Sequence, residues 1–274
     1  MSFEPEAIRT FEHAGWQRAA SSYASSFAHA TARYIEPLLQ AAEISSGQHV
    51  LDVACGPGDL AAAASVRGAI AHGLDFSAEM VGIARSAHRE IVVTEGDAEH
   101  LPYPDGTFHA VVSSFGIHHV PRPEVALAEC WRVLRPGGRI AFAVWATPEE
   151  NTAWSLVFDA VDRHGDRSAS KAPPPGGLNR TDQCVRLLEG AGFVDGSAEI
   201  VRAEWSLRDG RALLAALAAG TARMAALLAA QEPSALAAIA DDVNSQAERF
   251  RRGENLAIPI AAVLARGRKP ANTP

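Results

Sequence analysis

The stretch VLDVACGPGDL, residues 50–60, joins an apolar, strand-like run to two closely spaced glycines, Gly56 and Gly58. Glycines at a strand-to-helix junction let the backbone approach a ligand, and the N-terminus of the following helix presents free N–H groups and positive potential. One carboxylate, Asp52, lies inside the apolar run. The stretch therefore predicts a strand, a ligand-binding turn and a helix, with an anionic ligand group favoured at the turn.

Strand-like and helical runs alternate on both sides of the turn. Such alternation predicts a parallel sheet covered by helices, so we expect a doubly wound α/β fold. LRPGG at 134–138 carries Pro and Gly stop signals and ends the last of these helices. The expected strands are 49–54, 69–75, 90–96, 109–115 and 139–145, and the expected helices between them are 61–67, 77–88 and 124–134.

The regular alternation weakens outside this region. Residues 5–44 are rich in alanine and predict amphipathic helices interrupted near Pro37. The Pro- and Gly-rich segment at 165–180 has two interpretations, a mobile lid or an inert linker. The remaining expected elements are helices at 149–164 and 181–193, a strand at 198–207, a long helical region at about 209–252 and a last strand at 255–265.

Composition limits the class of protein. The chain has 274 residues, 47% of them hydrophobic, and a formal net charge of -7, which disfavours nucleic acid and anionic lipid as partners. It has no basic leader and no run of ~18 apolar residues that would span a membrane. Cys55, Cys130 and Cys184 are scattered and form no C-x-x-C pair, so neither a disulfide framework nor a zinc site is predicted. We expect a soluble, cytoplasmic protein that binds a small molecule.

The glycine turn fits a nucleotide fingerprint. Gly56, Gly58 and Ala61 satisfy G-x-G-x-x-A, and Asp75 lies where a ribose-binding acid is expected. This match does not separate NAD from other adenosine cofactors. Asp52 helps to decide, because a carboxylate is poorly placed beside a pyrophosphate but useful near an ammonium or sulfonium charge. S-adenosylmethionine fits that description.

Four ordered stretches extend the pattern: VLDVACGPGDL, GLDFSAEMVGIAR, GDAEHLPYPDGTFHAVVSSFGIHHV and ECWRVLRPGGRI. Over roughly residues 47–146 the chain resembles the class I S-adenosylmethionine-dependent methyltransferases, in the group of the ubiquinone and menaquinone C-methyltransferases and related small-molecule methyltransferases. The resemblance implies a Rossmann-like sheet of seven strands whose last strand, 258–267, is antiparallel. It also implies one domain over 1–274, with a helical cap at 1–44, a cofactor-binding core at 47–146, and a remainder at 147–274 with a helical insert at about 209–252.

The resemblance assigns roles position by position. It implies that the glycine turn and the end of the fourth strand surround the methionine portion of the cofactor, that an acid after the second strand holds the ribose, and that a methionine and a third loop contact the adenine. The residues implied are Asp52, Gly56, Gly58 and Ser114 for methionine, Asp75 for ribose, Met80, Asp97 and Ala98 for adenine, and Pro57, Phe76 and Tyr23 as further cofactor-binding residues.

Several of these residues also have structural interpretations. Asp52 can brace the glycine loop through backbone N–H groups, a role compatible with cofactor binding. Phe76 and Met80 suit ordinary core packing, and so does Tyr23 on an N-terminal helix. Ser77 is a better helix N-cap than Asp75, which favours the ribose role for Asp75.

His118 and His119 follow the fourth strand, at the edge where open parallel sheets bind ligands. One of them can serve as a general base, and packing is the alternative. The quinone enzymes tend to carry an Arg-Asn pair here, and Ala54 and Pro57 also depart from their pattern, so the resemblance does not extend to a quinone acceptor.

The predicted function is methyl transfer from S-adenosylmethionine to a small organic acceptor, with S-adenosylhomocysteine as product and no metal. An NAD-dependent oxidoreductase and a non-catalytic nucleoside-binding regulator are the alternatives.

Overall fold

The computed structural model describes residues 4–173 and 177–271. Within these residues an eight-stranded sheet has the order β3-β2-β1-β4-β5-β8-β6, with β7 paired to β8. The first five strands in chain order are parallel, and β8 is antiparallel to both β5 and β6, which confirms the expected seven-stranded arrangement and adds the two-residue β7. The strands are β1 (His49–Val53), β2 (Ile70–Asp75), β3 (Val92–Glu95), β4 (Phe108–Ser114), β5 (Leu134–Trp145), β6 (Val194–Leu207), β7 (Arg251–Arg252) and β8 (Asn255–Arg268).

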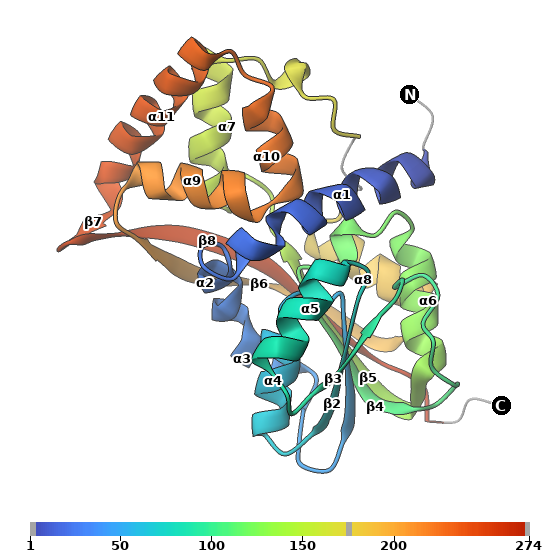
Figure 1. Ribbon diagram of the computed structural model, residues 1–274. Coiled ribbons are helices and arrows are strands. Elements are labelled where there is room, and N and C mark those ends of the chain that lie inside the picture. The colour runs from blue at the N-terminus through green and yellow to red at the C-terminus, as the bar shows by residue number, and fades with distance from the viewer. Residues whose placement is uncertain (1–3, 174–176, 272–274) are drawn as a thin grey trace.

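Helices cover both faces of the sheet (Figure 1). One face packs against α3 (Ile35–Ala41), α4 (Asp59–Val66) and α5 (Ala78–Ala87), and the other against α6 (Pro123–Val133) and α8 (Thr181–Gly190). The apolar residues of β1 are fully buried, as expected for a strand that is covered on both sides. The expected doubly wound α/β fold is confirmed.

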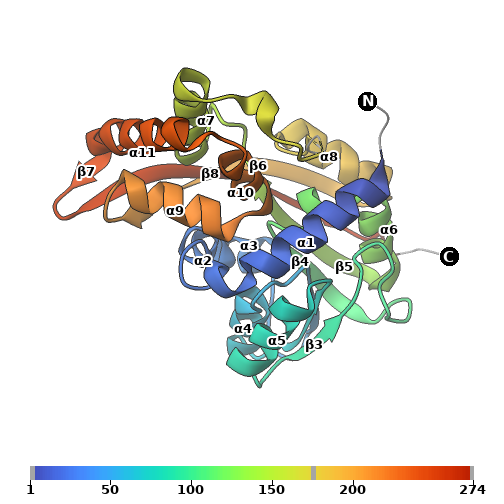
Figure 2. The ribbon, with the colours of Figure 1, turned by 45° about the horizontal axis from the view of Figure 1, so that its top comes forward.

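A group of helices covers the end of the sheet formed by β6 and β8. Figures 1 and 2 show α7 (Thr152–His164), α9 (Gly210–Gly220), α10 (Ala222–Ala229) and α11 (Pro233–Ala247) gathered there, with α1 (Pro5–Tyr23) between α10 and α5. Contacts of α1 with α5, α9 and α10 agree with both views. We call α1, α7, α9, α10 and α11 the cap. The short elements are α2 (Ala28–Thr31), η1 (Ala32–Tyr34), η2 (Ile117–His119), η3 (Arg167–Ala169) and η4 (Glu248–Phe250).

The expected helical region at about 209–252 is present, and it is divided into α9, α10, α11 and η4. The chain turns by 110° between α9 and α10, where Thr221 is extended, and Pro233 begins α11. Proline suits the first position of a helix, because its missing N–H would be unpaired there anyway. Residues 251–252 belong to β7.

Two further boundaries differ from the expectation. The N-terminal helices are interrupted at residues 24–27, and Pro37 lies in the first turn of α3, where a proline is tolerated. The stop signal LRPGG does end α6 at Val133, but β5 already begins at Leu134. A shift of register between Phe108 and Ala110 of β4 accommodates the Pro-Gly-Gly residues inside the strand.

Among the described residues, no single helix has the length and hydropathy of a membrane span. Taken together, α9 and α10 have that length and composition, but they are bent by 110° at their junction.

Candidate functional site

A cavity of about 400 Å³ lies at the carboxyl ends of β1, β2, β4 and β5. The strand order reverses between β1 and β4, and ligands of open α/β sheets bind at such a switch point. Residues of α1, α7 and α10 contribute the opposite wall. The cap therefore encloses the place where the fold itself predicts a ligand.

The turn after β1 has three residues in the left-handed region, Ala54 (φ 56°), Gly56 (φ 54°) and Gly58 (φ 90°). A Cβ built on Gly56 would meet no described atom within 4 Å, and Gly56 lines the cavity, so its missing side chain leaves room for a ligand. Gly58 serves a different purpose: a Cβ there would lie 3.1 Å from Cδ1 of Ile91, so this glycine permits close packing.

Asp75 ends β2 at the cavity wall and is only 5% exposed. Its Oδ2 accepts a hydrogen bond from the Gly56 N–H at 2.8 Å, and its Oδ1 accepts one from the Ser77 N–H at 2.9 Å. Ser77 itself caps α5 by accepting from the Met80 N–H, as expected. Each carboxylate oxygen of Asp75 keeps a second lone pair for a ligand donor.

Burial raises the pKa of the Asp75 carboxyl to about 6, although the N–H groups of Ser77 and Gly56 lower it. Because the pKa of Asp75 in the folded protein is raised above its ordinary value, the ligand-free protein loses stability as pH rises from about 4 to about 6 and the carboxyl ionises. A ligand that donates hydrogen bonds to this carboxylate favours the ionised form.

We therefore expect the affinity for a ribose-containing ligand to be constant above pH 7 and to fall by roughly tenfold per pH unit well below pH 6. Calorimetric titration with S-adenosylhomocysteine at pH 5, 6, 7 and 8 measures this. The matched Asp75→Asn variant should bind weakly with a flatter profile, and an equally steep profile in that variant would contradict the assignment.

Asp52 is buried beneath the glycine turn and does not line the cavity. Its Oδ2 accepts from the Ala61 N–H at 3.2 Å, so the bracing role is present, and burial raises the pKa of its carboxyl well above the usual range. Its Oδ1 is buried without a hydrogen-bond partner among the described residues. A buried carboxylate oxygen of this kind favours a nearby donor or positive charge.

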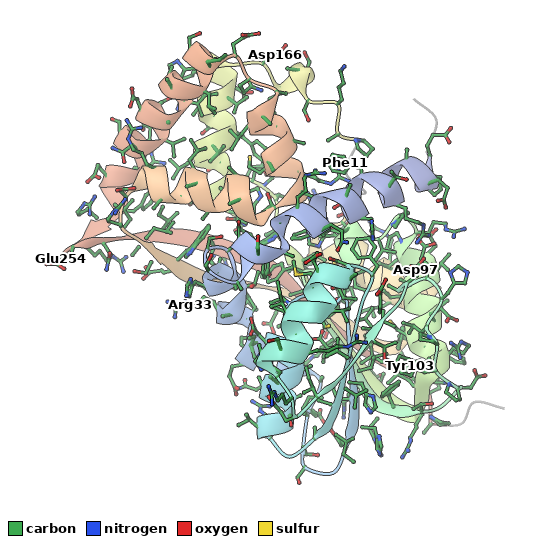
Figure 3. The ribbon with its side chains drawn as sticks, in the orientation of Figure 1. Phe11, Arg33, Asp97, Tyr103, Asp166 and Glu254 are labelled. Carbon is green, nitrogen blue, oxygen red and sulfur yellow. The ribbon has the colours of Figure 1, made fainter. Side chains whose placement is uncertain are left out.

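Asp97 and Ala98 follow β3 and line the cavity, as do Phe76 and Met80. The guanidinium of Arg9 on α1 donates to Asp97 and, at 2.9 Å, to the fully buried carboxylate of Glu99. Asp97 thus lies between α1 and the sheet, as Figure 3 shows. These ion pairs link α1 of the cap to the loop after β3 at that end of the cavity.

The turn after β4 carries backbone strain beside the cavity. Phe115 has φ 58°, and a Cβ on Gly116 would lie 2.4 Å from Cβ of Ala54 in the β1 turn. A left-handed bulky residue costs about 1–3 kcal/mol, and such residues cluster at functional sites. The close packing of the two turns places Ser114, His118 and the β1 turn around one cavity.

His118 and His119 both line the cavity, with ring centroids 4.1 Å apart. Nδ1 of His119 lies 3.1 Å from Oε2 of Glu12, a carboxylate on α1 with no exposed side-chain area. Glu12 also lies 2.8 Å from Nε of Arg223 and accepts from Nε1 of Trp16 at 3.1 Å. A buried acid is thus close to side-chain nitrogen atoms from α1, η2 and α10.

The structure brings most of the sequence-predicted site residues to one cavity. It does not bring Asp52, Pro57 and Gly58 to the cavity surface, because the turn directs them under the loop or against neighbouring helices. The sequence-predicted residues that do line the cavity are Tyr23, Gly56, Asp75, Phe76, Met80, Asp97, Ala98, Ser114, His118 and His119.

Sequence reasoning missed much of the cap wall. The helical pattern of the cap predicts buried aromatics, but nothing local shows which of them face a ligand, and charges on helices usually face solvent. The missed cavity residues include Arg9, Trp154, Phe158, Arg223, Met224 and Leu227 of the cap, and Phe27, Phe115, Trp145 and Leu178 outside it. Gly177, Leu178 and Asn179 of the segment at 165–180 also line the cavity, while residues 174–176 of that segment lie outside the described residues.

Within the described ranges, no group of three or more His, Cys, Asp and Glu side chains is arranged to hold a metal ion.

Comparison with known proteins adds the family. Residues 51–142 match the family described as Methyltransferase domain. The chain is 37% identical over 118 residues to a demethylmenaquinone methyltransferase of Renibacterium salmoninarum, covering 43% of this chain and 50% of the relative. A relative of the same name from Thermus thermophilus is 40% identical over 117 residues, covering 40% of this chain and 53% of its own length. The chain thus spans about half the length of these curated relatives.

Solved structures share the fold at low identity. A phosphoethanolamine N-methyltransferase 2 of Haemonchus contortus, in complex with phosphomonomethylethanolamine and S-adenosylhomocysteine, has a TM-score of 0.53 and 19% identity, covering 87% of this chain and 53% of that one. The [4+2]-cyclase SpnF has a TM-score of 0.52 and 24% identity, covering 88% and 81%. The fold therefore hosts more than one named reaction.

The family match falls on the strands and turns that build the cavity wall, and the neighbours share the sheet and its helices. Residues 51–142 thus match a methyltransferase domain, and the chain shares the Rossmann-like fold of its structural neighbours.

Proposed function

We propose that this chain transfers a methyl group from S-adenosylmethionine to a small organic acceptor. The observation that carries the proposal is Asp75 at the end of β2, hydrogen-bonded to the Gly56 N–H at the cavity wall. A turn without a side chain and a carboxylate with free lone pairs together suit a nucleoside with adjacent hydroxyls. The methyltransferase-domain match over 51–142 supports this ligand.

The residues present fit the cofactor. Asp75 would accept from the ribose hydroxyls, Asp97 and Ala98 would contact the adenine, and Gly56 and Ser114 would contact the methionine portion, since all five line the cavity. The open space beside Gly56 and the Asp75 carboxylate at the cavity wall are the observations that support this fit.

S-adenosylmethionine, when bound, supplies an electrophilic methyl group on a positively charged sulfur. The task of the chain is to align an acceptor and to exclude water, and positioning of this kind supplies ~7–11 kcal/mol of a barrier. The cap residues that enclose the cavity perform both tasks. Arg9 holds α1 down over the cofactor end through Asp97 and Glu99.

We expect S-adenosylhomocysteine to bind with a dissociation constant in the micromolar range, which corresponds to a binding free energy of about -8 kcal/mol. Isothermal titration calorimetry with S-adenosylhomocysteine and with NAD, on the same preparation, measures both. Binding of NAD without S-adenosylhomocysteine would overturn the proposal in favour of an oxidoreductase, which G-x-G-x-x-A alone also permits. Binding of S-adenosylhomocysteine without methyl transfer to any member of an acceptor panel would favour the non-catalytic regulator.

We do not propose demethylmenaquinone, the acceptor in the names of the curated relatives, as the acceptor of this chain. His118 and His119 stand where the resemblance leads one to expect an Arg-Asn pair, and the cap is built from segments outside the matched residues. We infer a dissolved acceptor and action in the cytoplasm, without nucleic acid, from the net charge of -7 and from the three free, buried cysteines.

A further inference from the structure

Glu12 is an unusual residue for the inner face of a helix that covers an apolar cavity. Its carboxylate has no exposed area, and burying a charge is costly unless the charge is paired. It is paired with His119 at 3.1 Å and Arg223 at 2.8 Å, and burial, which alone would raise the pKa of Glu12, is outweighed by these two residues and Trp16, so its pKa is lowered. Glu12 is therefore ionised at neutral pH.

Close packing of α1 on α10 makes this pairing possible. A Cβ on Gly15 would lie 2.4 Å from Cβ of Ala222, so a glycine at this position lets the two helices approach. Glu12 of α1 and Arg223 of α10 lie about one turn away or less from that contact. The juxtaposition is a feature of the cap and not of the cofactor-binding strands.

Nδ1 of His119 and the rest of its side chain face different surroundings. Nδ1 is buried and lies against Glu12, whereas the side chain as a whole is 18% exposed and lines the cavity. The exposed area of the side chain therefore belongs to atoms other than Nδ1. A carboxylate opposite Nδ1 favours the tautomer with the proton on Nδ1 and leaves the Nε2 lone pair free.

His118 lacks this arrangement. Nδ1 is buried outside hydrogen-bond geometry in both histidines, but only that of His119 has a carboxylate recorded beside it, at 3.1 Å. Burial, together with His119 and Arg223, lowers the pKa of His118 well below the usual range. His118 stays neutral and has no acid to orient it. The two neighbouring histidines are thus distinguished by Glu12.

An aromatic group lines the cavity where α7 of the cap meets the ends of β4 and β5. Trp145 stacks on Phe115 at 3.9 Å between ring centroids and lies 4.5 Å from Trp154. Arg223 also lines the cavity, and its charge is paired with Glu12 at 2.8 Å. Such a wall accommodates a flat apolar molecule, and His119 beside it suits a hydroxyl group that can donate its proton.

We propose that His119, oriented by Glu12, accepts the proton of a flat, apolar acceptor that carries an acidic hydroxyl group, a phenol in the simplest case. This inference rests on the proposed methyl transfer. The acceptor O–H bond breaks and its proton moves to Nε2 of His119, while the oxygen forms a bond to the methyl carbon and the electron pair of the broken carbon–sulfur bond returns to sulfur. The imidazolium is stabilised by Glu12 until the proton leaves to solvent. Glu12 is a positioning residue, because it acts through His119.

The first test needs no acceptor. In protein labelled with ¹⁵N-histidine at pH 8, long-range ¹H–¹⁵N correlation spectra report which ring nitrogen carries the proton, and His119→Asn assigns the signal. We expect His119 to be protonated at Nδ1 in the wild type and predominantly at Nε2 in Glu12→Met. Glu6→Gln, a change at an exposed acid of the same helix, should leave the spectrum of the wild type unchanged. An Nε2–H tautomer in the wild type, or no change in Glu12→Met, would overturn the role of Glu12.

The second test uses two probes of equal shape, 1-naphthol and 1-naphthylamine, titrated into the complex with S-adenosylhomocysteine. We expect the naphthol to bind at least ~10-fold more tightly than the amine, and the difference to shrink in Glu12→Met. Preference for the amine, or no binding of the naphthol, would overturn the acceptor class.

Titration of every variant with S-adenosylhomocysteine separates the possible failures. Loss of cofactor binding in the wild type refutes the proposed function, whatever the state of His119. Normal cofactor binding with the wrong tautomer refutes only the inference about Glu12. Equal cofactor affinity in Glu12→Met and the wild type also shows that the variant is folded.

Discussion

Asp75→Ala should weaken the binding of S-adenosylhomocysteine by about 1.5 to 3 kcal/mol, or roughly 10- to 150-fold, since charge-assisted hydrogen bonds to the ribose are lost. Asp75 lines the cavity with a lone pair free on each carboxylate oxygen. Calorimetry at pH 7.5 measures the loss. At that pH the carboxyl, whose pKa is raised to about 6, is ionised in the wild type.

The same substitution should also lower the melting temperature of the ligand-free protein. The N–H groups of Gly56 and Ser77 donate to Asp75, and both lose their acceptor in the variant. Affinity is therefore measured at a temperature where circular dichroism shows the variant to be folded.

Asp105→Ala is the matched control. Asp105 is 80% exposed, pairs with Arg132 of α6 and does not line the cavity, so its removal should change cofactor affinity by less than ~0.5 kcal/mol. Equal losses of affinity for the two alanine variants would mean that the ribose site lies elsewhere.

Trp205→Ala should lower the free energy of unfolding by about 3 to 5 kcal/mol. Among the described residues, Trp205 of β6 is the largest fully buried side chain, with 1% of its surface exposed. Its ring packs in a T-shaped arrangement with that of Phe27, with 5.5 Å between the ring centroids. Phe27 in turn contacts Trp145 and Trp154, so the cavity left by the substitution opens inside the aromatic group that supports the cap wall. Urea titration followed by circular dichroism measures the change.

Val66→Ala serves as the control, because Val66 is 88% exposed and its truncation should change stability by less than ~0.5 kcal/mol. Trp205→Phe should fall between the two, which keeps the test informative where the alanine variant fails to fold. A loss below about 1 kcal/mol for Trp205→Ala would contradict the packing described for the cap.

The cofactor half of the site was predictable because its signals are local. A left-handed turn selects glycine at Gly56, a buried strand end places Asp75, and Ser77 marks the start of α5. These requirements act within a few residues, so they can be read along the chain. Even here burial decided the finer outcome, since Asp52 braces Ala61 beneath the turn and does not reach the cavity surface.

The cap was less predictable, because helix breaks depend on packing as much as on propensity. The alanine- and leucine-rich run at 209–252 has a helical pattern throughout, but Gly220 must approach Phe27 closely, and the chain turns there. Propensity is a weak prior that tertiary contacts override. By contrast, the antiparallel last strand was expected from the family resemblance and is present as β8.

The sequence by itself determined the alternation of strands and helices, the glycine turn and the acid at the end of β2, because periodicity and backbone conformation are properties of neighbouring residues. Only the tertiary structure decided that Glu12, His119 and Arg223, far apart along the chain, share one buried contact beside the cavity. A charged residue on a helix has the same local pattern whether it faces water or a partner. Burial of its charge depends on which helix packs against it, and that is settled only when the whole chain is folded.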